Sequence, residues 1–444
     1  MNRILTRVCA LVLLLLPLSG SGADDNSYFQ ARRKAFMDRI EGSAALLEGA
    51  AETRDYVPFR QDNNFYYLTG VEAPGAFLLV DASARRSILF LPPRNLTLEQ
   101  WEGPRLFAGE QAQAATGIDD VMDVARLQAE LDKRKATFKG IYVVMAPEET
   151  TETSRDRAAQ FENAREQSPW DGRISRAKAF AQKLGKILGG VPINDLSPIL
   201  DGMRRIKDEQ ETGRMREAAR IGALGISEAM RDTAPGRYEY QIAEAATFIF
   251  RWNGAAGPAY FPIVGAGPDS CFLHYSANTR KIEAGDIVVM DYAPEYRYYD
   301  SDITRSFPAS GKFSDEQIKL YEIVLEAQKA AIQKVRPGST FADITKAARE
   351  VVSRHGYDKF WQHGVSHFVG MSVHDVGTQD TLQTGMVLTI EPGLYVREKN
   401  LGVRIEDTVL VKDQGCEVLT QGVPKEIAAI EKLMLEKGLM PKNQ

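Results

Sequence analysis

Two aspartates could together bind a cation in the segment GDIVVMDYAPEYRYYDSDITRSF. Asp291 follows a short apolar, β-branched run, and Asp302 follows an aromatic-rich stretch that can turn and come back. A turn centred on Tyr296 and Arg297 would place the two aspartates opposite each other on the arms of a β-hairpin. Directly opposed side chains have Cβ atoms about 5 Å apart, and like charges there are destabilising. We therefore expect a divalent cation between the two carboxylates.

An internal repeat extends this pattern. The sequence GDIVVMDYAPEY from Gly285 recurs as GMVLTIEPGLY from Gly385, so that Asp291 and Glu391 occupy the same place in two strands. Glu406 lies on the strand that returns after Glu391. The residue numbers of this pair add to an odd number, as those of Asp291 and Asp302 do, so the same kind of hairpin register can place the two carboxylates opposite each other. We expect two hairpins that form two halves of one pseudo-symmetric site, unless a β-bulge shifts the register.

Histidines are few and clustered. The five are His274, His355, His363, His367 and His374. Three of them fall within HGVSHFVGMSVHD, whose glycine and small residues allow close approach of the backbone. Spacings of four and seven do not by themselves define a set of ligands. His355 follows a predicted helix end and is interpreted as an ordinary surface residue.

Several motifs together resemble one protein family. HGVSHFVGMSVHD, MDYAPEYRYYDSDITR, TIEPGLY and GVRIED resemble the pita-bread metallopeptidases (M24B), a family that includes aminopeptidase P and prolidase. RQDNNFYYLTGVEAPGAFLLV resembles the N-terminal domain of the same proteins. The resemblance implies an α+β fold, in which a pseudo-twofold pita-bread catalytic domain is preceded by a smaller α/β domain.

The resemblance also implies a dinuclear metal site. Its ligands would be Asp291, Asp302, His367, Glu391 and Glu406. Four carboxylates and one imidazole are a hard, oxygen-rich set, which favours Mn²⁺ while leaving Zn²⁺, Co²⁺ and Fe²⁺ open. A hydroxide that bridges two such ions would be the nucleophile, and the ions would stabilise the oxyanion formed on the amide.

The remaining roles are implied by the same resemblance. His274 and His374 would donate hydrogen bonds to substrate or intermediate, and Glu391 would also accept the proton of the attacking water. These three residues are the expected catalytic groups.

Four further residues are expected to contact the substrate. His363, Tyr395 and Arg404 would line the proline side of the cleft, and Tyr260 would lie near the metals. The alternative for Arg404 is charge balance beside Glu406.

The expected activity is release of the first residue from peptides with proline second. An Xaa-Pro bond has no N–H, and its ring fixes φ, so a dedicated pocket is needed. One alternative is a prolidase that cleaves Xaa-Pro dipeptides and clamps the proline carboxylate with Arg404 or a basic residue of the first domain. Another is a pita-bread protein that binds peptides without catalysis, although such relatives typically lose ligands. Ala293 stands where the family usually has glycine, and without strain it needs a negative φ.

Composition and the two ends of the sequence set the broad class. The 444 residues are 44% hydrophobic and 26% charged, with a net charge of −5 and no basic stripe, so nucleic acid is not an expected partner. Residues 1–23 have the pattern of a secretory signal peptide, which predicts an exported protein, periplasmic or secreted, without a stable membrane anchor after cleavage. The resemblance implies a homo-oligomer.

Local patterns predict two domains, 24–200 and 201–444. Residues 26–49 have helical spacing, and FYYLTGV, AFLLVDA, SILFLPP and GIYVVMAP are predicted strands. Capping boxes at Ser314 and Thr340 predict helices that end near residues 336 and 356. Cys271 and Cys416 are interpreted as small hydrophobic residues, although one disulfide between them is possible.

Overall fold

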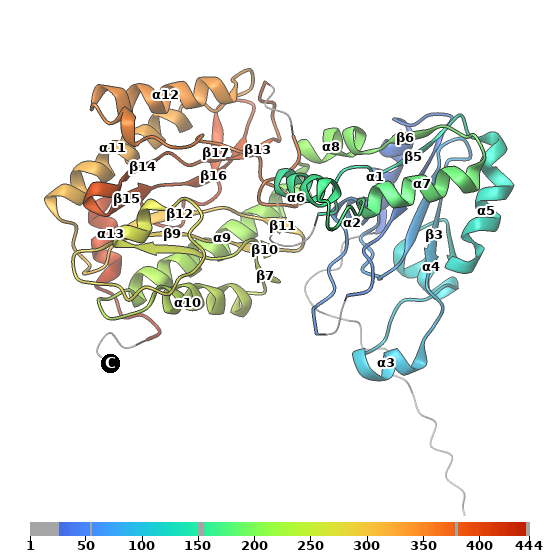
Figure 1. Cartoon of the computed structure of the whole chain (residues 1–444), viewed down its shortest axis with the longest axis horizontal. Helices are drawn as coiled ribbons and strands as arrows, with labels where there is room; N and C mark the ends of the chain where they lie inside the picture. Colours follow the sequence, from blue (N-terminus) through green and yellow to red (C-terminus); the bar gives the residue numbers. More distant parts are fainter. Residues whose placement is uncertain (1–25, 54–55, 150–154, 378–380, 441–444) are drawn as a thin grey trace, which may run out of the picture.

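The chain forms two regions that lie side by side in a computed structural model (Figure 1). The model describes residues 26–53, 56–149, 155–377 and 381–440. The predicted signal peptide lies outside the described residues. The domain boundary expected at residue 200 falls inside helix α8 (Ser197–Arg205), which connects the two regions.

The first region is a six-stranded mixed sheet with helices on both faces. Its strand order is β4-β3-β2-β1-β5-β6, with β1 antiparallel to β2 and parallel to β5. The strands are β1 (Ala44–Glu48), β2 (Phe77–Asp81), β3 (Arg86–Leu91), β4 (Asp120–Asp123), β5 (Ile141–Val143) and β6 (Ile193–Asp195). The helices before α8 are α1 (Asn26–Met37), α2 (Asn63–Thr69), α3 (Leu96–Glu102), α4 (Glu110–Thr116), α5 (Leu127–Arg134), α6 (Arg155–Gln167) and α7 (Arg176–Leu188).

Alternation along β1 separates the two faces of this sheet. Ala44 and Leu46 pack with α5 and α7, whereas Ala45 and Leu47 belong to a cluster that also includes buried side chains of the second region. The second face of the sheet is therefore the face against which the second region docks.

Two local predictions in the first region are wrong. Residues 44–48 form strand β1 rather than helix, because this segment lies between β2 and β5 and buries both of its faces. FYYLTGV is largely helix α2 rather than strand. Asp62 caps its N-terminus by accepting a hydrogen bond from the Phe65 N–H, and Gly70 ends it in the left-handed conformation. These caps outweigh the β-propensity of the aromatic residues.

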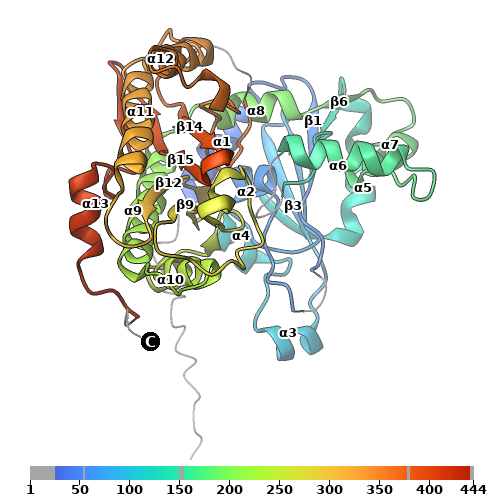
Figure 2. The ribbon, with the colours of Figure 1, turned by 60° about the vertical axis from the view of Figure 1, so that its left-hand side comes forward.

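The second region repeats one unit twice, a helix pair followed by hairpin strands. The first unit has α9 (Glu209–Asp232), α10 (Glu239–Trp252), β7 (Gly257–Pro258), β8 (Ile263–Ala266), β9 (Ile287–Asp291), β10 (Pro294–Tyr296), β11 (Tyr299–Asp300) and β12 (Thr304–Pro308). The second has α11 (Asp315–Ile332), α12 (Phe341–Arg354), β13 (Val387–Ile390), β14 (Gly393–Val396), β15 (Leu401–Arg404), β16 (Asp407–Val411) and β17 (Cys416–Val418), and α13 (Ile427–Met434) follows. The strands lie between the two helix pairs (Figures 1 and 2).

Both predicted capping boxes are present. Ser314 and Gln317 cap α11 reciprocally, and Thr340 and Asp343 cap α12. Helix α11 ends at Ile332, a few residues before the predicted stop.

The register of the first hairpin differs from the prediction by two residues. Asp291 pairs with Thr304 rather than with Asp302, because the turn is centred on Arg297 and Tyr298. Both turn residues have positive φ, 49° and 68°. That conformation suits a two-residue hairpin turn, but its usual residues are Asn and Gly, so the sequence carries no signal for it. A shift of two keeps both aspartates on the same face.

The second hairpin has the predicted register. Ile390 pairs with Asp407 and Gly393 with Arg404, which places Glu391 opposite Glu406 between these pairs. Ala293 is not among the described residues with positive φ, so this departure from the family pattern introduces no backbone strain.

The two described cysteines are not bonded to each other. Cys271 is buried, and Cys416 is partly buried. Within the described part of the chain, no helix combines the length and apolar character needed to cross a membrane.

Candidate active site

All five predicted metal ligands line one cavity of about 410 Å³ in the second region. His274, His374 and Tyr260 line it too, together with Arg157, Phe261, Ile263 and Val373. Five residues far apart in the sequence therefore converge, as the two-hairpin prediction requires.

The strands place the four carboxylates at strand ends. Asp291 is the last residue of β9, and Asp302 lies in the short link before β12. Glu391 directly follows β13, and Glu406 lies between β15 and β16. At these positions the regular ladder stops, and all four side chains line the cavity.

His367 is oriented as a nitrogen ligand would be. Its Nδ1 lies 3.1 Å from the carbonyl oxygen of Phe368, which places the N–H on that side of the ring. Its Nε2 lies 3.4 Å from Asp302 and 3.6 Å from Glu391. One ligand atom each from Asp302, His367 and Glu406 lie within 4.8 Å of one another.

Without a cation, the negative charges of these buried carboxylates are not balanced. Burial, and then the charge of Asp291, raise the pKa of Asp302 to about 6, and burial with three neighbouring carboxylates raises the pKa of Glu406. Burial alone would lower the pKa of His367, but Asp302 and Glu391 raise it to about 9. Buried carboxylates this close are stabilised by hard divalent cations, so the residues present fit such ions.

Tyr260 adds a further indication of this fit. Its hydroxyl oxygen lies 2.6 Å from one carboxylate oxygen of Asp291 and 2.6 Å from one of Asp302. The hydroxyl has one proton, so it can donate to only one of them at a time. The burial of this phenol and the two adjacent carboxylates raise its pKa well above the usual value, which keeps it a proton donor.

His363, Tyr395 and Arg404 form a hydrogen-bonded chain behind Asp291. Tyr395 Oη lies 2.9 Å from His363 Nε2 and accepts a hydrogen bond of 2.9 Å from Arg404, whose guanidinium also donates to Asp291 at 2.8 Å. Arg404 and Tyr395 are 3% and 1% exposed and are not among the residues lining the cavity. The charge partner of Arg404 is therefore Asp291 rather than Glu406, and a substrate contact for these three residues stays a prediction.

Two of the remaining histidines line the cavity, and one lies on the surface. His374 stacks on His367 with ring centroids 3.9 Å apart, and His274 packs edge-on to Phe261 at the cavity wall. Burial lowers the pKa of His274, so its ring is neutral near pH 7. His355 lies on the surface and pairs with Glu326 at 3.1 Å.

Three threonines that the sequence analysis missed hold the ligands in place. Thr304 donates to Glu406 at 2.6 Å, Thr389 accepts from the backbone N–H of His367 at 3.1 Å, and Thr408 accepts from the N–H of Asp302 at 3.1 Å. A signal was available, because each threonine stands two residues along the chain from a carboxylate ligand, a spacing that places both on one face of an extended segment.

Arg157 is the other residue that the sequence analysis missed. It lies on the first turn of α6, in the first region, and lines the cavity of the second. No sequence motif marks this residue.

Comparisons with known proteins show similarity over most of the chain. A family model described as Metallopeptidase family M24 matches residues 213–413, and one described as Aminopeptidase P, N-terminal domain, matches residues 29–142. A Haemophilus influenzae protein named Xaa-Pro aminopeptidase is 36% identical over 91% of this chain and 96% of its own length. A Pyrococcus horikoshii protein named Xaa-Pro dipeptidase is also 36% identical, but over only 54% of this chain and 70% of its own.

A solved structure extends the likeness to the whole fold. The structure of Escherichia coli aminopeptidase P with the inhibitor Pro-Leu has a TM-score of 0.78 and 30% identity, covering 93% of this chain and 99% of that one. The predicted fold class, a pita-bread domain preceded by a smaller N-terminal domain, is confirmed. The chain belongs to metallopeptidase family M24 and carries the N-terminal domain of aminopeptidase P.

Proposed function

We propose that this protein is a metal-dependent exopeptidase that releases the first residue from peptides with proline at the second position. The observation that carries the proposal is the gathering of Asp291, Asp302, His367, Glu391 and Glu406 around one cavity. Similarity to Xaa-Pro aminopeptidases over nearly the whole chain supports the substrate class. A non-catalytic binding protein would have no need for this complete set of ligands.

The proposed cofactor is a pair of divalent ions held by these five residues. The oxygen-rich donor set supports Mn²⁺ as the native metal, with Zn²⁺, Co²⁺ and Fe²⁺ as the alternatives. When bound, the ions would lower the pKa of a shared water and polarise the scissile carbonyl.

The side chains around the cavity have three further roles, which are proton transfer, hydrogen bonding to the substrate and support of the ligands. Glu391, less buried than Glu406, accepts the proton of the attacking water and returns it to the departing proline nitrogen. His274 and His374, at the cavity wall, donate hydrogen bonds to the substrate carbonyl oxygen as negative charge develops there. Tyr260 holds Asp291 and Asp302 in one arrangement, and Arg404 balances the charge of Asp291.

The length of the peptide substrate distinguishes an aminopeptidase from a prolidase. Arg404 is already committed to Asp291 and Tyr395, which argues against its clamping the carboxylate of a dipeptide. Among the described residues that line the cavity, Arg157 is the only arginine, and its side chain is exposed. We propose that it contacts the peptide beyond the proline, where longer substrates have carbonyl oxygens.

The test is a comparison of three substrates with the purified, Mn²⁺-loaded chain. We expect release of the first residue from Xaa-Pro-Xaa, slower or no turnover of the Xaa-Pro dipeptide, and none of Xaa-Ala-Xaa. Arg157→Gln should raise KM for Xaa-Pro-Xaa about tenfold, the equivalent of one charged hydrogen bond. Absence of turnover with both metals bound would overturn the peptidase assignment, and turnover of the dipeptide alone would establish a prolidase.

We also propose that the chain is exported with residues 1–23 removed, and that it forms a homo-oligomer. The pattern of that segment supports export, and the family resemblance supports oligomers. N-terminal sequencing of the secreted or periplasmic protein should begin at about residue 24.

A further inference from the structure

The segment from His367 to Asp375 is a closed loop that forms part of the cavity wall. The Asp375 N–H donates to the carbonyl of Phe368 at 2.9 Å, and the Gly370 N–H donates to the carbonyl of Ser372 at 3.1 Å. His367 begins the loop and His374 stands near its end, and their rings stack. A change in the conformation of the loop therefore changes the position of one ring relative to the other.

The first region forms direct hydrogen bonds with this loop. The Asn63 amide nitrogen, from α2, lies 2.9 Å from the carbonyl oxygen of Met371 and 3.0 Å from Ser372 Oγ. It also lies 2.8 Å from a carboxylate oxygen of Glu149, so its two N–H groups are shared among three acceptors. The loop that carries His374 thus rests on groups that lie outside the catalytic region.

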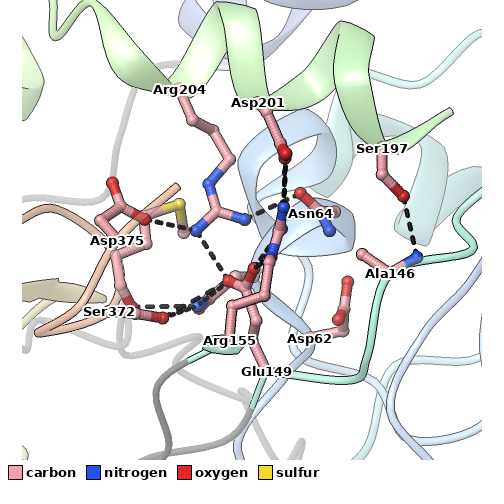
Figure 3. Close-up of polar contacts among 12 residues, drawn as sticks. Asp62, Asn64, Ala146, Glu149, Arg155, Ser197, Asp201, Arg204, Ser372 and Asp375 are labelled. Atoms are coloured by element: carbon pink, nitrogen blue, oxygen red, sulfur yellow. Dashed lines mark hydrogen bonds and ion pairs between the residues drawn. The ribbon is translucent and has the colours of Figure 1, made fainter. Parts of the chain in front are cut away.

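An ion-pair network continues from this contact (Figure 3). Arg204 of α8 lies 2.7 Å from Glu149 and 2.7 Å from Asp375, the residue next to His374. Lys207 binds the other oxygen of Asp375 at 3.0 Å. The side chains of Arg204, Glu149, Asp375 and Lys207 are each 1% exposed.

The network is balanced in charge and closely packed. Arg155 pairs with Glu149 and with Asp201, which gives three cations and three anions. Arg204 and Arg155 hold the pKa of Glu149 far below its usual value, although burial acts in the opposite direction. A Cβ on Gly370 would come within 1.9 Å of an Asp375 oxygen, so this approach requires glycine. Buried ion pairs contribute little net stability compared with apolar packing, and their strict geometry is better suited to fixing a position.

We propose that Glu149, Arg204 and Asp375 are positioning residues, through which the first region sets the placement of His374 for catalysis. The inference rests on the proposed peptidase function for its kinetic consequence, but not for its structural one. A misplacement of about 1 Å at a catalytic group can cost up to 100-fold in rate. Loss of the Glu149 charge should therefore lower kcat without removing any group from the cavity.

The test compares Glu149→Gln with a matched control, Glu211→Gln. Glu211 is also a buried carboxylate that pairs with an arginine of the first region, Arg32, at 3.1 Å, but it joins α1 to α9. Each substitution removes one charge from a buried pair between the regions. We expect kcat of the folded, metal-loaded Glu149→Gln protein to fall about tenfold at nearly constant KM, with two metals still bound. The control should keep kcat within twofold.

A second readout does not depend on activity. With five histidines in the chain, the ring resonances of His367 and His374 can be assigned by NMR in the Zn²⁺-loaded protein, because Zn²⁺ is not paramagnetic. Because the two rings stack, Glu149→Gln should shift both signals, and Glu211→Gln should shift neither. If Glu149→Gln fails to fold, Ser372→Ala provides a milder variant, since it removes a hydrogen-bond partner of Asn63 and leaves no unpaired charge.

Unchanged histidine signals in Glu149→Gln and Ser372→Ala, or an equal loss of kcat in the control, would overturn the proposal. A wild-type protein without Xaa-Pro turnover would instead refute the proposed function, and the NMR comparison would still decide whether the network positions His374.

Discussion

At the scale of single residues, the site depends on hydroxyl groups as well as on ligands. Thr304 pairs with Asp291 across the hairpin, donates to Glu406 at 2.6 Å and accepts from Arg404 at 3.1 Å. It therefore links Glu406 to Arg404, whose guanidinium also donates to Asp291. Outer groups of this kind orient metal ligands and tune their affinity.

Thr304→Val keeps the shape of the side chain and removes this hydroxyl. We expect metal affinity to fall about tenfold to 100-fold, because Glu406 loses the donor that fixes its orientation. Isothermal titration of the metal-free protein with Mn²⁺ measures the change, and Thr304→Ser, which keeps the hydroxyl, is the control. Equal affinity for Thr304→Val and the wild type would refute this role.

At the scale of elements, the turn of the first hairpin decides which residues face each other. The turn residues Arg297 and Tyr298 are in the left-handed region, which costs a non-glycine residue roughly 1–2 kcal/mol. Contacts with the first region offset this cost, since Tyr298 stacks on Tyr66 with centroids 3.6 Å apart and its hydroxyl binds Glu72 at 2.7 Å. The turn is thus held by tertiary contacts and not by local preference.

Arg297→Asn should stabilise the protein by about 0.5–1 kcal/mol, because asparagine tolerates the left-handed region better than arginine. Arg297→Val should destabilise it, because a β-branched residue is strained at positive φ. Both changes are measured by the shift in the midpoint of urea unfolding. The slope m of the unfolding free energy against urea concentration should stay constant. The interpretation fails if valine is tolerated as well as asparagine.

At the scale of the whole molecule, the two regions share one core. Buried Phe36 and Leu78 of the first region belong to the same cluster as Met215, Val369 and Val387 of the second. The ion pairs at this interface, including Glu149 with Arg204, therefore lie in a dry environment. Their contribution to stability should depend on pH in opposite directions for different carboxylates.

Glu149→Gln should lower the free energy of unfolding at pH 7 by about 3 kcal/mol, because it leaves buried arginine charge uncompensated. The folded-state pKa of Glu149 is far below the usual 4.5, so its contribution is complete above pH 4.5 and is lost as pH falls. The difference from wild type should shrink by about 1 kcal/mol between pH 7 and pH 4.

Glu211→Gln should behave in the opposite way. Burial raises the pKa of Glu211, so its contribution is complete below the unfolded-state pKa and is lost as pH rises. The wild-type advantage over this variant should therefore grow between pH 7 and pH 4. Urea unfolding of both variants across this range measures the two trends, and parallel trends would contradict the assignment.

Much of the site follows from sequence because its parts are local. Glu391 lies opposite Glu406 because each follows a short strand and their residue numbers fit the register of one hairpin. The helix caps at Ser314 and Thr340 are also local, since each needs only a side chain and the next turn.

Only the tertiary structure decided what depends on contacts between distant segments. Burial on both faces made residues 44–48 a strand, and packing against the first region moved the turn to Arg297 and Tyr298. The approach of Arg157 to the cavity, and the link from Glu149 through Arg204 to the loop of His374, join residues more than 100 positions apart. Strand periodicity and caps act within a few residues of the chain, whereas these contacts exist only once the two regions have docked.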